Sequence, residues 1–109
     1  MTGGEDVLPD NVYEIAFRLI AVAGDAKSDA MNAIKAARNK DYEKAQELLV
    51  SADQKMAIAH EIQFEVIQQE ANGNRVDLNI ILVHAQDHLT MALVMRDMAE
   101  EIVELYKRI

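Results

Sequence analysis

The stretch that decides the fold is residues 78–108, LNIILVHAQDHLTMALVMRDMAEEIVELYKR. It holds neither Gly nor Pro, and its apolar residues recur at steps of three and four, the spacing of one face of a helix. We expect a helix over 78–108, capped by Asp77, with Lys107 and Arg108 suiting the dipole of its last turn. The seam expected to face the core is Ile81, His84, His88, Met91, Met95, Met98, Ile102, Leu105 and Ile109.

Two more helices are predicted upstream, over residues 11–38 and 42–71, because apolar residues keep the same periodicity there. Asp41 is a suitable N-cap for the second helix, and Gly73 can end it in the left-handed conformation. Residues 1–10, MTGGEDVLPD, are expected to be a loose, flexible tail, with Pro9 just before the first helix. The predicted domain, 11–109, is therefore an all-α, antiparallel up-down-up three-helix bundle. Its spare apolar surface favours self-association.

Composition excludes several classes of function. The chain of 109 residues has 11 Lys and Arg against 19 Asp and Glu, a formal net charge of −8. This acidity argues against a nucleic acid partner and against an anionic membrane surface. The sequence contains no Cys, which excludes disulfides, thiolate metal sites and cysteine nucleophiles. No apolar run reaches the roughly 18–20 residues that span a bilayer, so we expect a cytoplasmic protein with no membrane insertion.

A polar cluster, His84-Ala85-Gln86-Asp87-His88, interrupts the apolar seam of the third helix. Polar groups placed in a core cost free energy unless they have partners, so a cluster of this kind indicates a functional site. A lone histidine there is more often a satisfied core residue. Two histidines, an aspartate and a glutamine within five residues favour function instead.

Three chemistries fit this cluster. His84 and His88, four residues apart on one helical face, could share a metal ion, although a third ligand and a substrate cleft are not evident. A neutral imidazole could act as a nucleophile on phosphorus, with His88 and Gln86 as auxiliary donors to the phosphoryl oxygens. Paired histidines could also serve as a pH sensor. The residues alone leave these alternatives open.

The string HAQDHL at 84–89 resembles the lactose/cellobiose (diacetylchitobiose) family of phosphotransferase system (PTS) IIA components. The similarity extends upstream over LNIILV at 78–83 and QEANG at 69–73, and to AGDAKS at 23–28 and DYEKA at 41–45. It covers roughly residues 10–109. There are departures as well, since Thr90 precedes Met91 where the family reads Met-Thr, and Gln63-Phe64 stands where it reads Gln-Thr. His60, nearby, is interpreted as structural.

The resemblance implies a homotrimer in which His84 accepts a phosphoryl group, on Nε2, from the phosphorylated histidine phosphocarrier protein (HPr). His84 then passes the group to a cysteine of the cognate IIB component during uptake of a disaccharide, of cellobiose or chitobiose rather than lactose type. The resemblance also implies that Asp87 lies on the trimer axis, where three copies share one divalent cation, expected to be Mg²⁺. The alternative is a non-catalytic assembly or regulatory module with a metal-binding His/Asp cluster.

Overall fold

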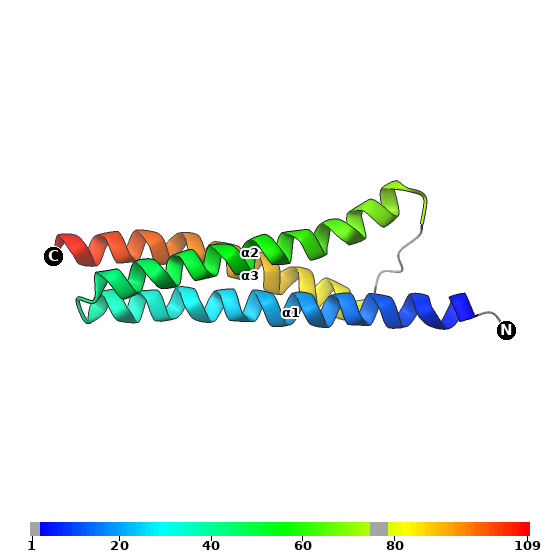
Figure 1. Ribbon diagram of the computed structural model, residues 1–109, viewed down its shortest axis with the longest axis horizontal. Helices are drawn as coiled ribbons and strands as arrows, with labels where there is room; N and C mark the ends of the chain where they lie inside the picture. The colour runs from blue at the N-terminus through cyan, green and yellow to red at the C-terminus, as the bar shows by residue number, and fades with distance from the viewer. Residues whose placement is uncertain (1–2, 75–78) are drawn as a thin grey trace.

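Three long helices make up the computed structural model, which describes residues 3–74 and 79–109, with side chains described from residue 12. They are α1 (Gly3–Arg38), α2 (Tyr42–Ala71) and α3 (Ile80–Arg108), and they form a rod of 64 × 20 × 20 Å. Figure 1 shows α1 and α3 running in the same direction with α2 antiparallel to both. The predicted all-α, up-down-up bundle is confirmed. None of these helices, over the described residues, is long and apolar enough to cross a membrane.

The first helix begins at Gly3, so the prediction of a start at Asn11 after a loose tail is wrong for residues 3–10. Pro9 was expected to lie outside the helix. A proline ring fixes φ near a helical value, and proline has no backbone N–H donor. A helix can therefore continue through it at a cost in stability. Residues 1–2 of the predicted tail lie outside the described residues.

The turns between the helices are set by local chemistry. Asp41 caps α2 as predicted, its side chain accepting a hydrogen bond from the Lys44 N–H at 3.2 Å. Gly73 ends α2 in the left-handed region, with φ of +85°. The cap of α3 is a correction: Asn79, rather than Asp77, accepts from the Leu82 N–H at 2.9 Å, and Asp77 lies outside the described residues.

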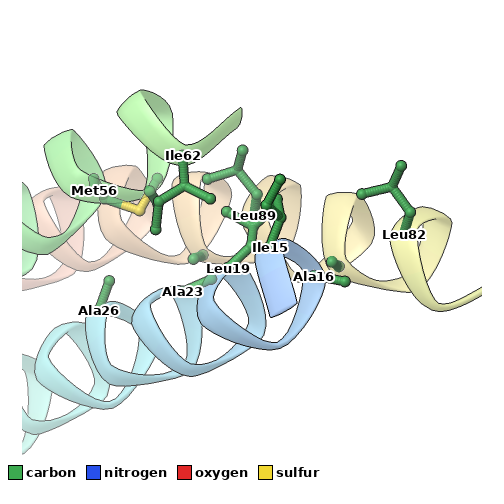
Figure 2. Packing of buried hydrophobic residues seen from close by; sticks show 12 residues of the cluster. Ile15, Ala16, Leu19, Ala23, Ala26, Met56, Ile62, Leu82 and Leu89 are labelled. Carbon is green, nitrogen blue, oxygen red and sulfur yellow. The ribbon is translucent and has the colours of Figure 1, made fainter. Parts of the chain in front are cut away.

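The core is built on α1, which packs along both other helices, whereas α2 and α3 contact each other much less. Figure 1 shows the C-terminal part of α2 leaning away from the other two helices. In Figure 2, Leu19 of α1, Ile62 of α2 and Leu89 of α3 converge in one apolar cluster. Nearer the α1–α2 turn the core is narrower, because alanines dominate it and small side chains let helix axes approach closely. The alanines there are Ala30, Ala33, Ala37, Ala45 and Ala99.

The predicted seam of α3 is wrong in its register. The buried residues of α3 are Leu82, Ala85, Leu89, Ala92, Ala99 and Val103. The predicted seam is the neighbouring stripe, which turns partly to solvent: Met98 is 53% exposed and Leu105 is 60% exposed. Both stripes have helical spacing, but the buried one carries small side chains that fit against the alanine-rich face of α1. His84 and His88 therefore interrupt an exposed apolar stripe and not the core.

Polar contacts centred on Asp29 and on Arg96 help to tie α2 to the other helices. Asp29 of α1 accepts a hydrogen bond from the Ser51 hydroxyl at 2.6 Å and pairs with the Lys55 ammonium group at 2.8 Å. Arg96 of α3 binds Asp53 of α2 through two nitrogens, one of them at 2.8 Å from Oδ2. These contacts hold α2 along the half of the rod where its apolar contacts are made largely by alanine.

Candidate phosphoryl-acceptor site on α3

His84 and His88 form a pair on the surface of α3. Their side chains lie one turn apart, and their Nε2 atoms are 3.0 Å from each other. The rings meet edge to face, with centroids 4.5 Å apart and an interplanar angle of 88°. The histidine pair predicted from the spacing is therefore present, with His84 exposed and His88 half-buried.

The environment of His88 keeps its imidazole neutral. Burial lowers the pKa of His88, the positive charges of His84 and Lys27 lower it further, and the Asp87 carboxylate acts in the opposite direction. Nδ1 of His88 is buried with no hydrogen-bond partner among the described residues. An unpaired acceptor is less costly to bury than an unpaired charge. The arrangement suits a neutral His88 that donates from Nε2 to Nε2 of His84.

Asp87 lies on the exposed side of α3, beside the apolar stripe. Four and seven residues further along the helix are Met91 and Val94, which are 47% and 56% exposed. Residues at these intervals share one helical face. A carboxylate thus stands at one end of an exposed apolar surface, which we name the α3 outer stripe: Met91, Val94, Met98, Leu105 and Ile109.

Gln86 does not join the histidine pair within one chain. Its side chain turns to α2, where Oε1 accepts a hydrogen bond from Nε2 of Gln63 at 2.6 Å. This bond uses the carbonyl oxygen of Gln86 and leaves its amide N–H groups available as donors. The Gln63 partner was missed by sequence reasoning, because nothing in the sequence reveals which α2 residue faces position 86.

Thr90 and His60 are both placed outside the histidine pair. The Thr90 hydroxyl donates to the main-chain carbonyl of Gln86 at 3.1 Å, so it is committed to its own helix. His60 was interpreted as structural near the inner face of α2, but it is exposed and borders a shallow hollow with Gln63 and Phe64. The side chain on the inner face one position earlier is Ala59, which is fully buried.

No complete metal site exists within one chain, over the residues whose side chains are described. No three His, Asp or Glu side chains there come close enough to hold a metal ion together. Asp87 offers one carboxylate on an open surface. Such a group fits a divalent cation only if further copies of the chain supply the remaining oxygen ligands.

The three-helix rod with a histidine pair on its last helix defines a class, that of the helical IIA components of sugar phosphotransferase systems. The family described as "PTS system, Lactose/Cellobiose specific IIA subunit" matches residues 14–107. The chain belongs to this family. It is therefore a IIA component of a sugar phosphotransferase system.

Relatives are similar over nearly their full length. The lichenan-specific phosphotransferase enzyme IIA component of Bacillus subtilis is 42% identical over 100 residues, 92% of this chain and 91% of the relative. The lactose-specific EIIA component of Staphylococcus epidermidis is 36% identical, covering 91% of this chain and 95% of the relative. The relatives thus differ in the sugar that their names give.

Solved structures agree with the fold. The PTS cellobiose-specific enzyme IIA from Bacillus anthracis has a TM-score of 0.86 and 39% identity, over 87% of each chain. A IIA(Chitobiose)–HPr complex of Escherichia coli has a TM-score of 0.78 and 29% identity, over 89% of this chain and 94% of that one.

Proposed function

We propose that this protein is the phosphoryl carrier of a disaccharide phosphotransferase system, and that His84 is the residue phosphorylated by HPr. The observation that carries the proposal is the contact of exposed His84 with a second histidine, His88, their Nε2 atoms being 3.0 Å apart. Membership of the IIA family and the similarity to a IIA(Chitobiose)–HPr complex support it. The formal charge of −8 also suits a basic donor protein.

The proposed transfer moves one phosphoryl group between two imidazoles. The lone pair of His84 Nε2 attacks phosphorus as the bond from phosphorus to the donor histidine nitrogen breaks and returns its electron pair to that nitrogen. His84 must then carry its proton on Nδ1, which leaves Nε2 as the nucleophile. In the second transfer, a cysteine thiolate of the cognate IIB component attacks the phosphorus carried by His84. A P–S bond forms as the P–N bond breaks, and the electron pair of the P–N bond returns to Nε2 of His84.

His88 has an auxiliary role in this proposal. Before transfer its Nε2–H donates to the His84 Nε2 lone pair, which fixes the orientation of the nucleophilic ring. After transfer that lone pair is bonded to phosphorus, and the same N–H is close enough to donate to a phosphoryl oxygen. Gln86 offers amide donors too, but its side chain lies toward α2, so it could reach only the site of a neighbouring copy.

The α3 outer stripe supports a homotrimer. Exposed apolar side chains along one helix are typical of an interface between subunits. Asp87 stands on the same surface, and three copies of it around an axis would repel one another. A hard divalent cation such as Mg²⁺ would neutralise these carboxylates and hold the subunits together. Its role in the proposal is structural, and no chemical step involves it.

The sugar is proposed to be a disaccharide of cellobiose or chitobiose type rather than lactose. The names of the relatives at 42% and 39% identity, lichenan and cellobiose, favour a β-linked glucose unit. We place the relay in the cytoplasm, because a reducing compartment keeps the acceptor cysteine of IIB as a free thiol.

The test is intact mass spectrometry after incubation with phosphoenolpyruvate, enzyme I and HPr. We expect the wild type to gain one phosphoryl mass, and His84→Ala to gain none while keeping its helical circular dichroism. His60→Ala is the matched control, because it removes another exposed histidine and should still be labelled. Labelling of His84→Ala would refute the site. An unlabelled wild type would favour a non-catalytic assembly or regulatory module.

A further inference from the structure

We propose that the end of the rod where α1 and α3 finish binds a sugar phosphate, with Arg38, Lys40 and Lys107 as the cations that hold its phosphate group. Lys107 is about 35 Å from His84 along α3, at the helical rise of 1.5 Å per residue. This site is therefore separate from the phosphoryl-acceptor site. The proposal goes beyond the proposed function, although a system that transfers a phosphoryl group to a sugar forms a ligand of this class.

A hollow opens where the last turns of α1 and α3 meet the start of α2. Figure 1 shows these three segments together at one end of the rod. The volume of the hollow is about 430 Å³, which lies within the range of pockets that take small molecules. The polar side chains that line it come from all three segments: Arg38, Lys40, Tyr42, Tyr106 and Lys107.

The lining of this hollow is basic although the chain is acidic. Among the described residues that border it, three have cationic side chains and none has a carboxylate side chain. The hollow beside Phe64 on α2 is lined by Glu61 and Glu65 instead. In a chain with a formal charge of −8, a hollow bordered by cations alone concentrates positive charge where an anion can reach it.

Two of the three cations are not neutralised within the chain. Neither Arg38 nor Lys40 forms an ion pair with a carboxylate among the described side chains, whereas Lys107 pairs with Glu104 at 3.1 Å. The Glu104 side chain is 50% exposed, and exposed pairs of this kind contribute little to stability. Lys107 can therefore leave Glu104 for a ligand that carries more negative charge.

Helix dipoles explain only part of this positive charge. Basic residues in the last turns of α1 and α3 suit the negative ends of these helices, each equivalent to about half a charge. The two ends together amount to about one negative charge, and the positive start of α2 offsets about half of it. Arg38 and Lys40 alone carry more positive charge than this, so the hollow remains attractive to an anion.

Lys40 has a backbone conformation that glycine would adopt more easily. Its φ is +64°, in the left-handed region that disfavours residues with a Cβ. The Lys40 N–H donates to the Ala37 carbonyl and the Asp41 N–H to the Ala36 carbonyl, both at 2.9 Å. Glycine is the usual residue at a helix end with this hydrogen-bond pattern. Because the turn itself would favour glycine, its lysine is better explained by the charge that it brings to the hollow.

The lining fits a sugar phosphate better than a bare phosphate ion. Guanidinium and ammonium groups are common phosphate partners, and a guanidinium can bind two oxygens at once. Tyr42 and Tyr106 are half-buried, and the Tyr42 hydroxyl donates to the Tyr106 main-chain carbonyl at 3.3 Å. Tyrosine has an apolar ring as well as a polar tip, so these side chains offer a surface for the uncharged part of the ligand.

The cations of the hollow do not belong to the α3 outer stripe. Arg38, Lys40 and Lys107 are exposed in the single chain, and Ile109 is the only residue that the hollow shares with the stripe. Assembly through the stripe therefore does not require these cations to be covered.

The experiment measures binding of glucose 6-phosphate, inorganic phosphate and glucose to the full chain by isothermal titration calorimetry. Arg38→Gln and Lys40→Gly each remove one cation from the hollow. Lys35→Gln is the matched control, because it removes an equal charge from an exposed position in the last turn of α1 that does not line the hollow. Sedimentation velocity verifies that the variants assemble as the wild type does.

We expect the wild type to bind glucose 6-phosphate more tightly than inorganic phosphate, and not to bind glucose. Arg38→Gln and Lys40→Gly should each weaken binding of glucose 6-phosphate by about tenfold, and Lys35→Gln should bind as the wild type does. Lys40→Gly should at the same time raise the midpoint of thermal unfolding, because glycine relieves the left-handed conformation. Opposite effects on binding and stability would show that the variant loses a ligand contact and not its fold.

A wild type that does not bind glucose 6-phosphate would refute the proposal. Equal affinity for inorganic phosphate and glucose 6-phosphate would refute the role of the sugar, and an equal loss of binding in Lys35→Gln would refute the hollow as the site. None of these results depends on labelling of His84, so failure here leaves the proposed function standing.

Discussion

At the scale of single residues, the contact between His84 and His88 determines which ring can be the nucleophile. His84 is exposed, whereas Nδ1 of His88 is buried with no hydrogen-bond partner among the described residues. A ring with one buried nitrogen cannot present that atom to a donor protein. The two histidines are therefore not equivalent, although their spacing in the sequence does not distinguish them.

The auxiliary role of His88 predicts a graded effect of substitution. His88→Ala removes the Nε2–H donor, and we expect labelling of His84 to slow by about tenfold or more. His88→Gln places an amide N–H near the position of Nε2, and it should retain more of the rate than His88→Ala. Rapid-quench labelling by HPr measures both. Equal rates for the two variants would show that the N–H donor does not matter.

The lowered pKa of His88 predicts how stability depends on pH. The pKa of His88 should be about 6.5 in the unfolded chain and lower than that in the folded protein. Between those two values the unfolded chain binds more protons, so the free energy of unfolding should fall as the pH is lowered below about 6.5. The contribution should be fully present above that pH.

Urea unfolding of the wild type and His88→Gln between pH 5 and pH 8 tests this prediction, with the midpoint of His88 followed by NMR. The wild type should lose more stability than His88→Gln on acidification, because glutamine does not titrate. A His88 midpoint at or above that of the urea-unfolded chain would contradict it.

At the scale of elements, the start of α3 positions the site. Asn79 caps the helix, and His84 lies little more than one turn later. Loss of the cap should fray the first turn of α3. This fraying would disturb the position of His84 beside His88.

We expect Asn79→Ala to reduce the free energy of unfolding by about 1 kcal/mol, because a side-chain acceptor for the Leu82 N–H is lost. Asn79→Asp keeps an acceptor at the same position and should remain close to the wild type. Thermal unfolding by circular dichroism measures the difference. A drop of equal size in both variants would mean that the Asn79 amide, and not its acceptor oxygen, supports the structure.

At the scale of the whole molecule, the α3 outer stripe places several exposed apolar side chains along one side of the rod. The buried core of a single chain is thin, being made of alanine over much of its length, and small domains gain stability when they associate. Asp87 is the one acidic group of the cluster on that side. Its charge opposes association unless a cation or a proton neutralises it.

The proposed trimer should therefore respond in opposite ways to two substitutions. Asp87→Leu removes the facing carboxylates and should assemble without a divalent cation, whereas the wild type should dissociate in part when a chelator removes the metal. Met98→Lys places a charge in the middle of the stripe and should yield monomers. Val50→Lys is its control, because Val50 is exposed on α2 and borders a hollow together with Glu43 and Glu47.

Sedimentation equilibrium with and without chelator gives the masses of these species. A Met98→Lys protein with the mass of the wild-type assembly would exclude the stripe as the interface. An Asp87→Leu protein that remains monomeric would show that the carboxylates attract the subunits, through their metal, more than their charge repels them.

The sequence by itself determined the three helices, the up-down-up order, the cap at Asp41, the glycine stop at Gly73 and the histidine cluster with its family. These features depend on residues within one or two turns of each other, so local physical chemistry decides them. The start of α1 and the cap of α3 were exceptions. A single Pro9 is compatible both with a helix start and with a helix that continues, and Asp77 and Asn79 are both residue types that cap helices.

Only the tertiary structure decided which of two neighbouring stripes of α3 is buried. Both have the spacing of a helical face, and the choice depends on how closely the alanine-rich face of α1 can approach. That choice placed His84 on the surface with His88 half-buried beside it, and sent Gln86 to Gln63 of α2. Contacts between helices depend on packing along the whole rod, and no short stretch of sequence contains that information.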